Sequence, residues 1–141
     1  MDRHATAVWK GTLKEGSGTV ETQSGALGKL PLSFKARFVD ESGKTGTNPE
    51  ELIAAAHASC FSQQLSHFLA ENGTPADSLE AKAVVTLVPG TGITGSKLTL
   101  VGKVPGIDDA KFQELAKKAK EGCPVSKALG AIDVSLDAKL G

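Results

Sequence analysis

The stretch from residue 49 to residue 71 constrains the fold more than any other part of the chain. It begins with Asn48-Pro49-Glu50-Glu51, which combines a capping residue, a proline at the first helical position and acids at the positive end of the helix dipole. No helix-breaking residue follows before Asn72-Gly73, so the pattern predicts one helix ~34 Å long. Its side chains are apolar or small around most of the circumference, which is typical of a helix buried on nearly all sides. One small sheet would cover a single face, and we therefore expect a second copy of the chain to cover the rest.

Strands are predicted on both sides of this helix, because apolar and polar residues alternate there with period two. The predicted strands cover residues 5–13, 19–23, 31–39, 79–88, 93–104 and 132–140. A short helix is predicted from the Asp108 cap to about residue 121, and another from Pro124 to Gly130. The order is βββ-α-ββ-αα-β, an α+β pattern, and we expect one domain over residues 1–141.

Composition excludes several classes of partner. The sixteen basic residues balance sixteen acidic ones, and aromatic residues are only 4% with no Tyr, so neither nucleic acid nor an anionic membrane is an expected partner. Residues 1–10 lack the apolar region of a secretory signal. We therefore expect a cytoplasmic, reducing setting, in which two cysteines more often serve redox chemistry or a metal than a structural disulfide.

One motif is misleading. Residues 90–95 read Gly-Thr-Gly-Ile-Thr-Gly, which matches the dinucleotide-binding fingerprint. That motif binds a pyrophosphate only where it opens a helix, and here an alternating strand pattern follows it. The sequence therefore predicts a glycine-rich hairpin connection and no nucleotide site.

The two cysteines lie in different settings. Cys60 is in the middle of the long helix, where a buried thiol often serves only to pack. Cys123 stands between Gly122 and Pro124 at the start of a short helix, where backbone N–H groups favour a thiolate. The two thiols could form a redox pair if the fold brings them together, which their spacing in the sequence does not show.

A metal site is the competing interpretation of these residues. His57 and Cys60 share one face of the helix, and His67 follows further along it. Zinc usually takes three or four ligands in close local pairs, and Cys123 has no second ligand beside it. We therefore expect no metal, with His57 and His67 at the helix surface or in an interface.

Two charged residues are further candidates. Arginine is rare, with fourteen Lys against only Arg3 and Arg37, and Arg37 lies between Ala36 and Phe38 in the predicted third strand. It could lie exposed over the sheet edge, or its planar cation could hold a thiolate and a peroxide oxygen. Glu50 is explained as a helix-start acid, but it lies ten residues, or ~15 Å, from Cys60. If both serve one pocket, one of them must come from a second subunit.

Two segments together resemble the family of osmotically inducible and organic hydroperoxide resistance proteins (OsmC/Ohr). They are residues 47–61, with Asn48-Pro49-Glu50 ten residues before Cys60, and residues 122–126, with Cys123 before Pro124. The resemblance implies an intertwined homodimer, with antiparallel sheets wrapped around long central helices. It also implies thiol-dependent reduction of peroxides, organic ones especially, with no cofactor and an external thiol or dithiol as reductant.

The resemblance also implies roles for single residues. Cys60 would be the peroxidatic thiol, Cys123 the resolving thiol, and Glu50 would hold the catalytic arginine. In the Ohr branch that arginine comes from the first hairpin, and residues 10–30 contain no Arg here. The OsmC branch takes it from the third strand, which points to Arg37. The alternative is a dimeric binding protein that holds a small apolar ligand, in which the cysteines only pack.

Overall fold

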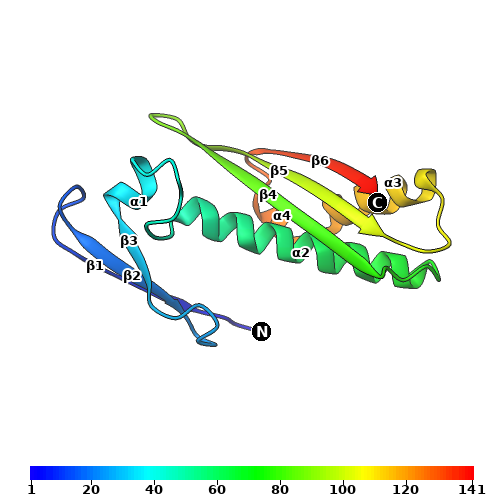
Figure 1. Ribbon diagram of the computed structural model, residues 1–141, viewed down its shortest axis with the longest axis horizontal. Helices are drawn as coiled ribbons and strands as arrows, with labels where there is room; N and C mark the ends of the chain where they lie inside the picture. The colour runs from blue at the N-terminus through cyan, green and yellow to red at the C-terminus, as the bar shows by residue number, and fades with distance from the viewer. The chain divides into compact units, whose positions relative to one another are not determined.

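The computed structural model describes all 141 residues, which form two compact units: unit 1 is Met1–Pro49 and unit 2 is Glu50–Gly141 (Figure 1). Both combine strands with helices, which confirms the α+β class. The elements are β1 (Ala5–Lys10), β2 (Ser17–Thr22), β3 (Leu30–Ser33), α1 (Phe34–Phe38), α2 (Pro49–Glu71), β4 (Ser78–Val88), β5 (Gly92–Lys103), α3 (Asp109–Gly122), α4 (Pro124–Ala128) and β6 (Asp133–Leu140).

Unit 1 is built on the predicted antiparallel meander, with strand order β1-β2-β3. The β1–β2 pairing places Trp9 opposite Gly18. A side chain at Gly18 would overlap the Val8 carbonyl oxygen and meet the Trp9 ring carbon Cε3 at 2.9 Å, so only glycine fits there. Large apolar side chains of this unit stay exposed, among them Val8, Trp9, Leu13, Leu27, Phe38 and Val39.

The third predicted strand is wrong in its second half. Residues 31–39 were expected to be extended, but β3 ends at Ser33 and α1 follows. The reason is local, because the Ser33 hydroxyl accepts a hydrogen bond from the Ala36 N–H at 3.0 Å and so caps a helical turn. The turn also packs Phe34 against Phe38, with ring centroids 5.0 Å apart and the rings tilted by 42°. The order is therefore βββ-αα-ββ-αα-β.

Unit 2 holds one sheet, of order β4-β5-β6, with α2 and α3 packed on it. Strands β4 and β5 form the predicted hairpin, but β6 pairs with β5 in parallel, so this sheet is mixed where antiparallel sheets were expected. A parallel pair needs a crossover connection, and α3 and α4 supply it between β5 and β6 (Figure 1).

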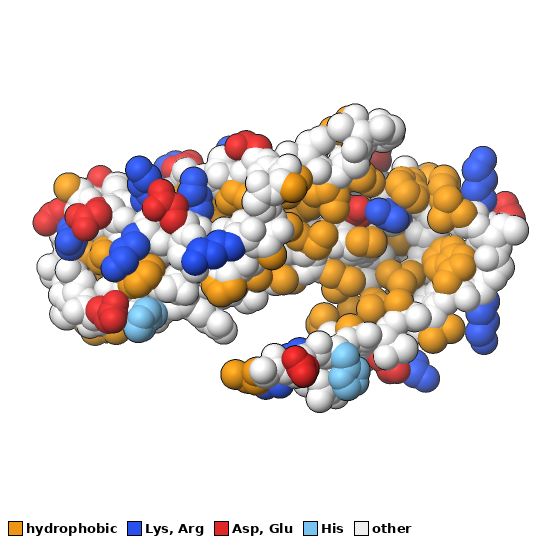
Figure 2. Space-filling model, turned by 180° about the vertical axis from the view of Figure 1, so that it is seen from behind, with side chains coloured by type: hydrophobic (Ala, Val, Ile, Leu, Met, Phe, Trp, Pro, Cys, Tyr) orange, Lys and Arg blue, Asp and Glu red, His pale blue; other side chains and the backbone are white.

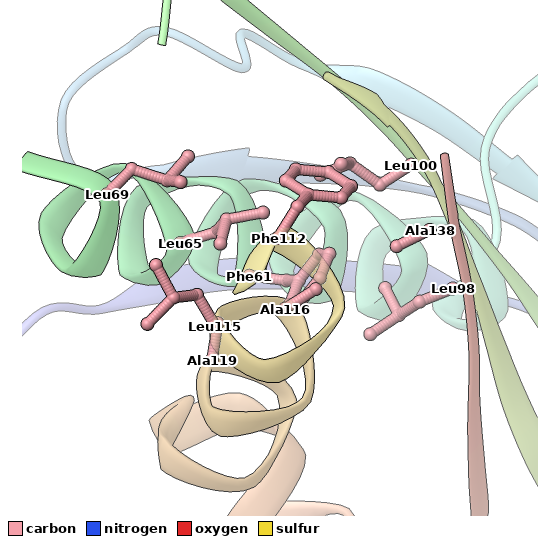
Figure 3. Close-up of a cluster of buried hydrophobic side chains, with 10 residues drawn as sticks. All are labelled: Phe61, Leu65, Leu69, Leu98, Leu100, Phe112, Leu115, Ala116, Ala119 and Ala138. Carbon is pink, nitrogen blue, oxygen red and sulfur yellow. The ribbon is translucent and has the colours of Figure 1, made fainter. Parts of the chain in front are cut away.

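The core of unit 2 joins α2, α3, β5 and β6, with side chains of the two helices pointing toward one another (Figure 3). Its members are Phe61, Leu65, Leu69, Leu98, Leu100, Phe112, Leu115, Ala116, Ala119 and Ala138.

The glycine-rich motif Gly90–Gly95 lies in the β4–β5 hairpin, as predicted, and opens no helix.

Helix α2 has the predicted bounds. Its buried side chains form one stripe at a spacing of four residues, from His57 through Phe61 and Leu65 to Leu69. Ala55 and Ala56 are exposed, so the burial expected on nearly all sides is not provided by this chain alone. No helix has both the length and the apolar character needed to cross a bilayer.

Candidate active site

The two cysteines lie side by side in unit 2. Cys60 is in the middle of α2, and Cys123 lies between the end of α3 and the start of α4. Their Sγ atoms are 2.9 Å apart although 63 positions separate them in the sequence. Both are free thiols; Cys123 is fully buried and Cys60 is half-buried. The fold thus provides the proximity that the sequence left open.

The break between α3 and α4 puts the Cys123 sulfur in place. Cys123 has φ −61° and ψ 121°, which ends α3, and Pro124 can begin a new helix but cannot continue the old one. The Cys123 sulfur then takes the role of an N-cap side chain and accepts a hydrogen bond from the Ser126 N–H at 3.5 Å. Donation from a backbone N–H favours the thiolate at this position.

The two thiols are shifted in opposite directions. Burial, together with the hydrogen bond to Cys123, raises the pKa of Cys60. Burial would also raise the pKa of Cys123, but its hydrogen bonds with Cys60 and Ser126 together lower it.

His57 is buried, which corrects the expectation of a surface or interface residue. It is fully buried, its Nδ1 lies 2.7 Å from the Ser96 hydroxyl, and its Nε2 lies 2.8 Å from the Ser126 hydroxyl. Burial lowers the pKa of this histidine. The sequence signal that could have indicated this burial is the position of His57 four residues before Phe61, in line with the apolar side chains of α2 that follow at the same spacing. His67, in contrast, lies at the surface beside Glu71, with Nε2 and Oε1 3.5 Å apart.

The residues considered above as metal ligands contact other groups in this structure. Both ring nitrogens of His57 are engaged by serine hydroxyls, and Cys60 contacts Cys123. No group of three or more His, Cys, Asp or Glu side chains is gathered as a metal ion would require.

Glu50 and Arg37 lie in different units. Glu50 is buried in the first turn of α2, ten residues before Cys60. Arg37 is in α1, where it lines a pocket of about 420 Å³ within unit 1, and its Cζ lies 5.0 Å from the centroid of the Phe38 ring. The other lining residues are mostly apolar and include Trp9, Leu13, Leu32, Phe34 and Pro49. The joint role of Glu50 and Arg37 beside the thiols stays a prediction.

Known proteins resemble this chain over nearly its whole length. It is 47% identical to Peroxiredoxin OsmC of Escherichia coli over 143 aligned positions, which cover 99% of this chain and 97% of that protein. The crystal structure of the organic hydroperoxide resistance protein OhrB of Bacillus subtilis superimposes with a TM-score of 0.66 at 31% identity and covers 96% of this chain and 97% of its own.

A third likeness concerns the fold alone. An OsmC-like protein of unknown function from Vibrio cholerae matches with a TM-score of 0.76 at 19% identity, over 98% of this chain and 99% of that one. The family model for OsmC-like proteins matches residues 41–137, a segment that contains Glu50, His57, Cys60 and Cys123. The chain therefore belongs to the OsmC-like protein family.

Proposed function

We propose that this protein is a thiol-dependent peroxidase that reduces organic hydroperoxides, and hydrogen peroxide more weakly. The observation that carries the proposal is the 2.9 Å separation of two unbonded sulfurs from distant parts of the chain. A disulfide bond is about 2.05 Å long, so the sulfurs need approach by only about 0.9 Å to bond. The relatives named peroxiredoxin and organic hydroperoxide resistance protein support the same chemistry.

In the first step, the Cys60 thiolate attacks the outer oxygen of the hydroperoxide. The O–O bond breaks, Cys60 becomes a sulfenic acid, and the alkoxide takes a proton and leaves as an alcohol. The peroxide is expected to react with Cys60 before Cys123, because Cys60 is half-buried whereas Cys123 is fully buried. In the second step, the Cys123 thiolate attacks the Cys60 sulfur and releases hydroxide, which takes a proton to form water. The product is a Cys60–Cys123 disulfide.

The peroxide step needs a cation, because unit 2 by itself raises the pKa of the Cys60 thiol. We assign this role to Arg37, held by Glu50. A guanidinium remains charged and can donate to both the thiolate and a peroxide oxygen, which a lysine does less well. The mostly apolar pocket that Arg37 lines in unit 1 would accept the alkyl part of the substrate.

The active form would be a homodimer. Unit 1 buries only two hydrophobic side chains, Val20 and Ala36, which is too small a core for 49 residues to fold alone. Figure 2 shows hydrophobic side chains gathered on its surface. Because Glu50 lies ~15 Å from Cys60 along α2, a pocket that uses both needs residues of two copies. The two units of each copy would then work as one OsmC-like domain over residues 1–141.

The cycle closes when an external thiol or dithiol reduces the disulfide, with no cofactor. That requirement fits a reducing compartment such as the cytoplasm.

Turnover of cumene hydroperoxide tests the proposal. Reduced protein, cumene hydroperoxide and excess dithiothreitol are mixed, and peroxide loss is followed against the Cys60→Ser variant. We expect sustained consumption by the native chain and none above the uncatalysed rate for the variant. A binding protein that only holds an apolar ligand would leave both the peroxide and the thiols unchanged, and that outcome would refute the peroxidase.

A further inference from the structure

His57 belongs to a buried hydrogen-bond chain that ends at the resolving thiol, and the inference drawn from it rests on the function proposed above. We propose that His57 is a positioning residue: with Ser96 and Ser126 it stabilises the Cys123 thiolate that leaves when the Cys60–Cys123 disulfide is reduced.

The chain joins three elements of unit 2. Ser96 is on β5, His57 on α2 and Ser126 on α4. The distances are 2.7 Å from the Ser96 hydroxyl to Nδ1 and 2.8 Å from Nε2 to the Ser126 hydroxyl. His57 and Ser96 are buried, so water does not compete for these contacts. The first turn of α4, which carries Cys123 at its cap, is thus tied to α2, which carries Cys60.

The contact that reaches the sulfur comes from the backbone of Ser126. Burial lowers the pKa of His57, so the ring is neutral, and one of its nitrogens donates while the other accepts. The Ser126 hydroxyl contacts Nε2, and the N–H of the same residue donates to the Cys123 sulfur at 3.5 Å. His57 thus holds in place the residue whose N–H stabilises the Cys123 thiolate.

The hydrogen bond from the Ser126 N–H matters most when a thiolate leaves. Because Cys60 is half-buried and Cys123 fully buried, the thiolate of an external dithiol attacks the Cys60 sulfur. The S–S bond breaks and its electron pair goes to Cys123, while Cys60 forms a mixed disulfide with the reductant. The second thiolate of the dithiol then attacks the reductant's own sulfur in that bond, which releases Cys60 as a thiolate and the reductant as its cyclic disulfide. A leaving thiolate that accepts hydrogen bonds leaves faster, and its stabilisation also favours the reduced pair at equilibrium.

The test uses the redox equilibrium of the disulfide and needs no peroxide. Native protein and variants are oxidised with diamide and equilibrated with mixtures of reduced and oxidised dithiothreitol, and the disulfide fraction is measured by mass spectrometry after alkylation. We expect Ser126→Ala to reduce the equilibrium constant for reduction about tenfold, which corresponds to a potential about 30 mV more negative. Ser126→Thr, which retains the hydroxyl, should restore the native value.

A double variant separates this role from simple packing. If His57 acts through Ser126, adding His57→Phe to Ser126→Ala should shift the potential no further, whereas each single variant shifts it. His67→Phe, the same change at the exposed histidine of α2, is the matched control and should leave the potential unchanged. The positioning role of His57 is wrong if Ser126→Ala keeps the native potential, or if the two changes add in full.

The outcomes also distinguish this inference from the function on which it rests. Failure of diamide to form an intrachain disulfide in the native protein would refute both. An intrachain disulfide whose potential does not respond to Ser126→Ala would refute the positioning role alone and leave the peroxidase intact.

Discussion

Oxidation of the cysteine pair should stabilise the fold, by an amount that follows from its position in the chain. The disulfide would close a loop across the 63 positions that separate Cys60 from Cys123. The chain-entropy relation gives about 4 kcal/mol of stabilisation for a loop of this length. For a chain of 141 residues this corresponds to an increase of about 10–15 °C in the melting temperature. Little of it should be lost to distortion, because the sulfurs are already 2.9 Å apart.

The assay is urea unfolding of the reduced and the diamide-oxidised protein at one protein concentration, since association also changes apparent stability. We expect the oxidised form to be more stable and the gain to disappear when dithiothreitol is added. Cys60→Ser and Cys123→Ser should show no gain. Equal stability of the two forms, or a gain that persists in either single-cysteine variant, would refute the placement of the two sulfurs on which the mechanism depends.

Three further outcomes follow from the site. With excess peroxide and no reductant, Cys123→Ser should let Cys60 pass from sulfenic to sulfinic acid, seen by mass spectrometry, whereas the native pair should stop at the disulfide. Arg37→Lys should slow peroxide-dependent loss of thiols at least tenfold while the circular dichroism spectrum stays native; an unchanged rate would move the cation's role to another residue. Because burial lowers the pKa of His57, the unfolded chain binds a proton there that the folded chain does not. The free energy of unfolding should therefore decrease as pH falls through about 6.5, and less steeply in His57→Phe; equal slopes would contradict the buried, neutral ring.

Local signals were strong enough to predict most elements. The Asn-Pro-Glu-Glu start and the Asn-Gly stop define α2, which runs from Pro49 to Glu71 as expected. The Asp108 cap likewise starts α3, where its side chain accepts from the Lys111 N–H. These signals are predictive because they act within one turn of the chain. The prediction of a third strand through residue 39 was wrong for a related reason. Phe34 and Phe38 are spaced for one face of a strand and also for one face of a helix, and the Ser33 cap selects the helix.

Features that depend on contacts between distant parts of the chain could not be predicted from the sequence. Nothing near residues 133–140 indicates that β6 runs parallel to β5, because strand direction depends on the crossover through α3 and α4. The approach of Cys123 to Cys60 likewise depends on how α3 packs against α2. His57 looked like a surface residue because its partners, Ser96 and Ser126, are common polar residues 39 and 69 positions away.

The central claim is that one peroxide molecule oxidises a pair of thiols within one chain. Reduced protein is treated with a stoichiometric amount of cumene hydroperoxide, quenched by alkylation, digested without reductant and mapped by mass spectrometry. The account predicts one linked peptide pair that joins Cys60 to Cys123, and loss of that pair in both single-cysteine variants. Alkylated, unlinked Cys60 and Cys123 after the peroxide has been added would contradict it.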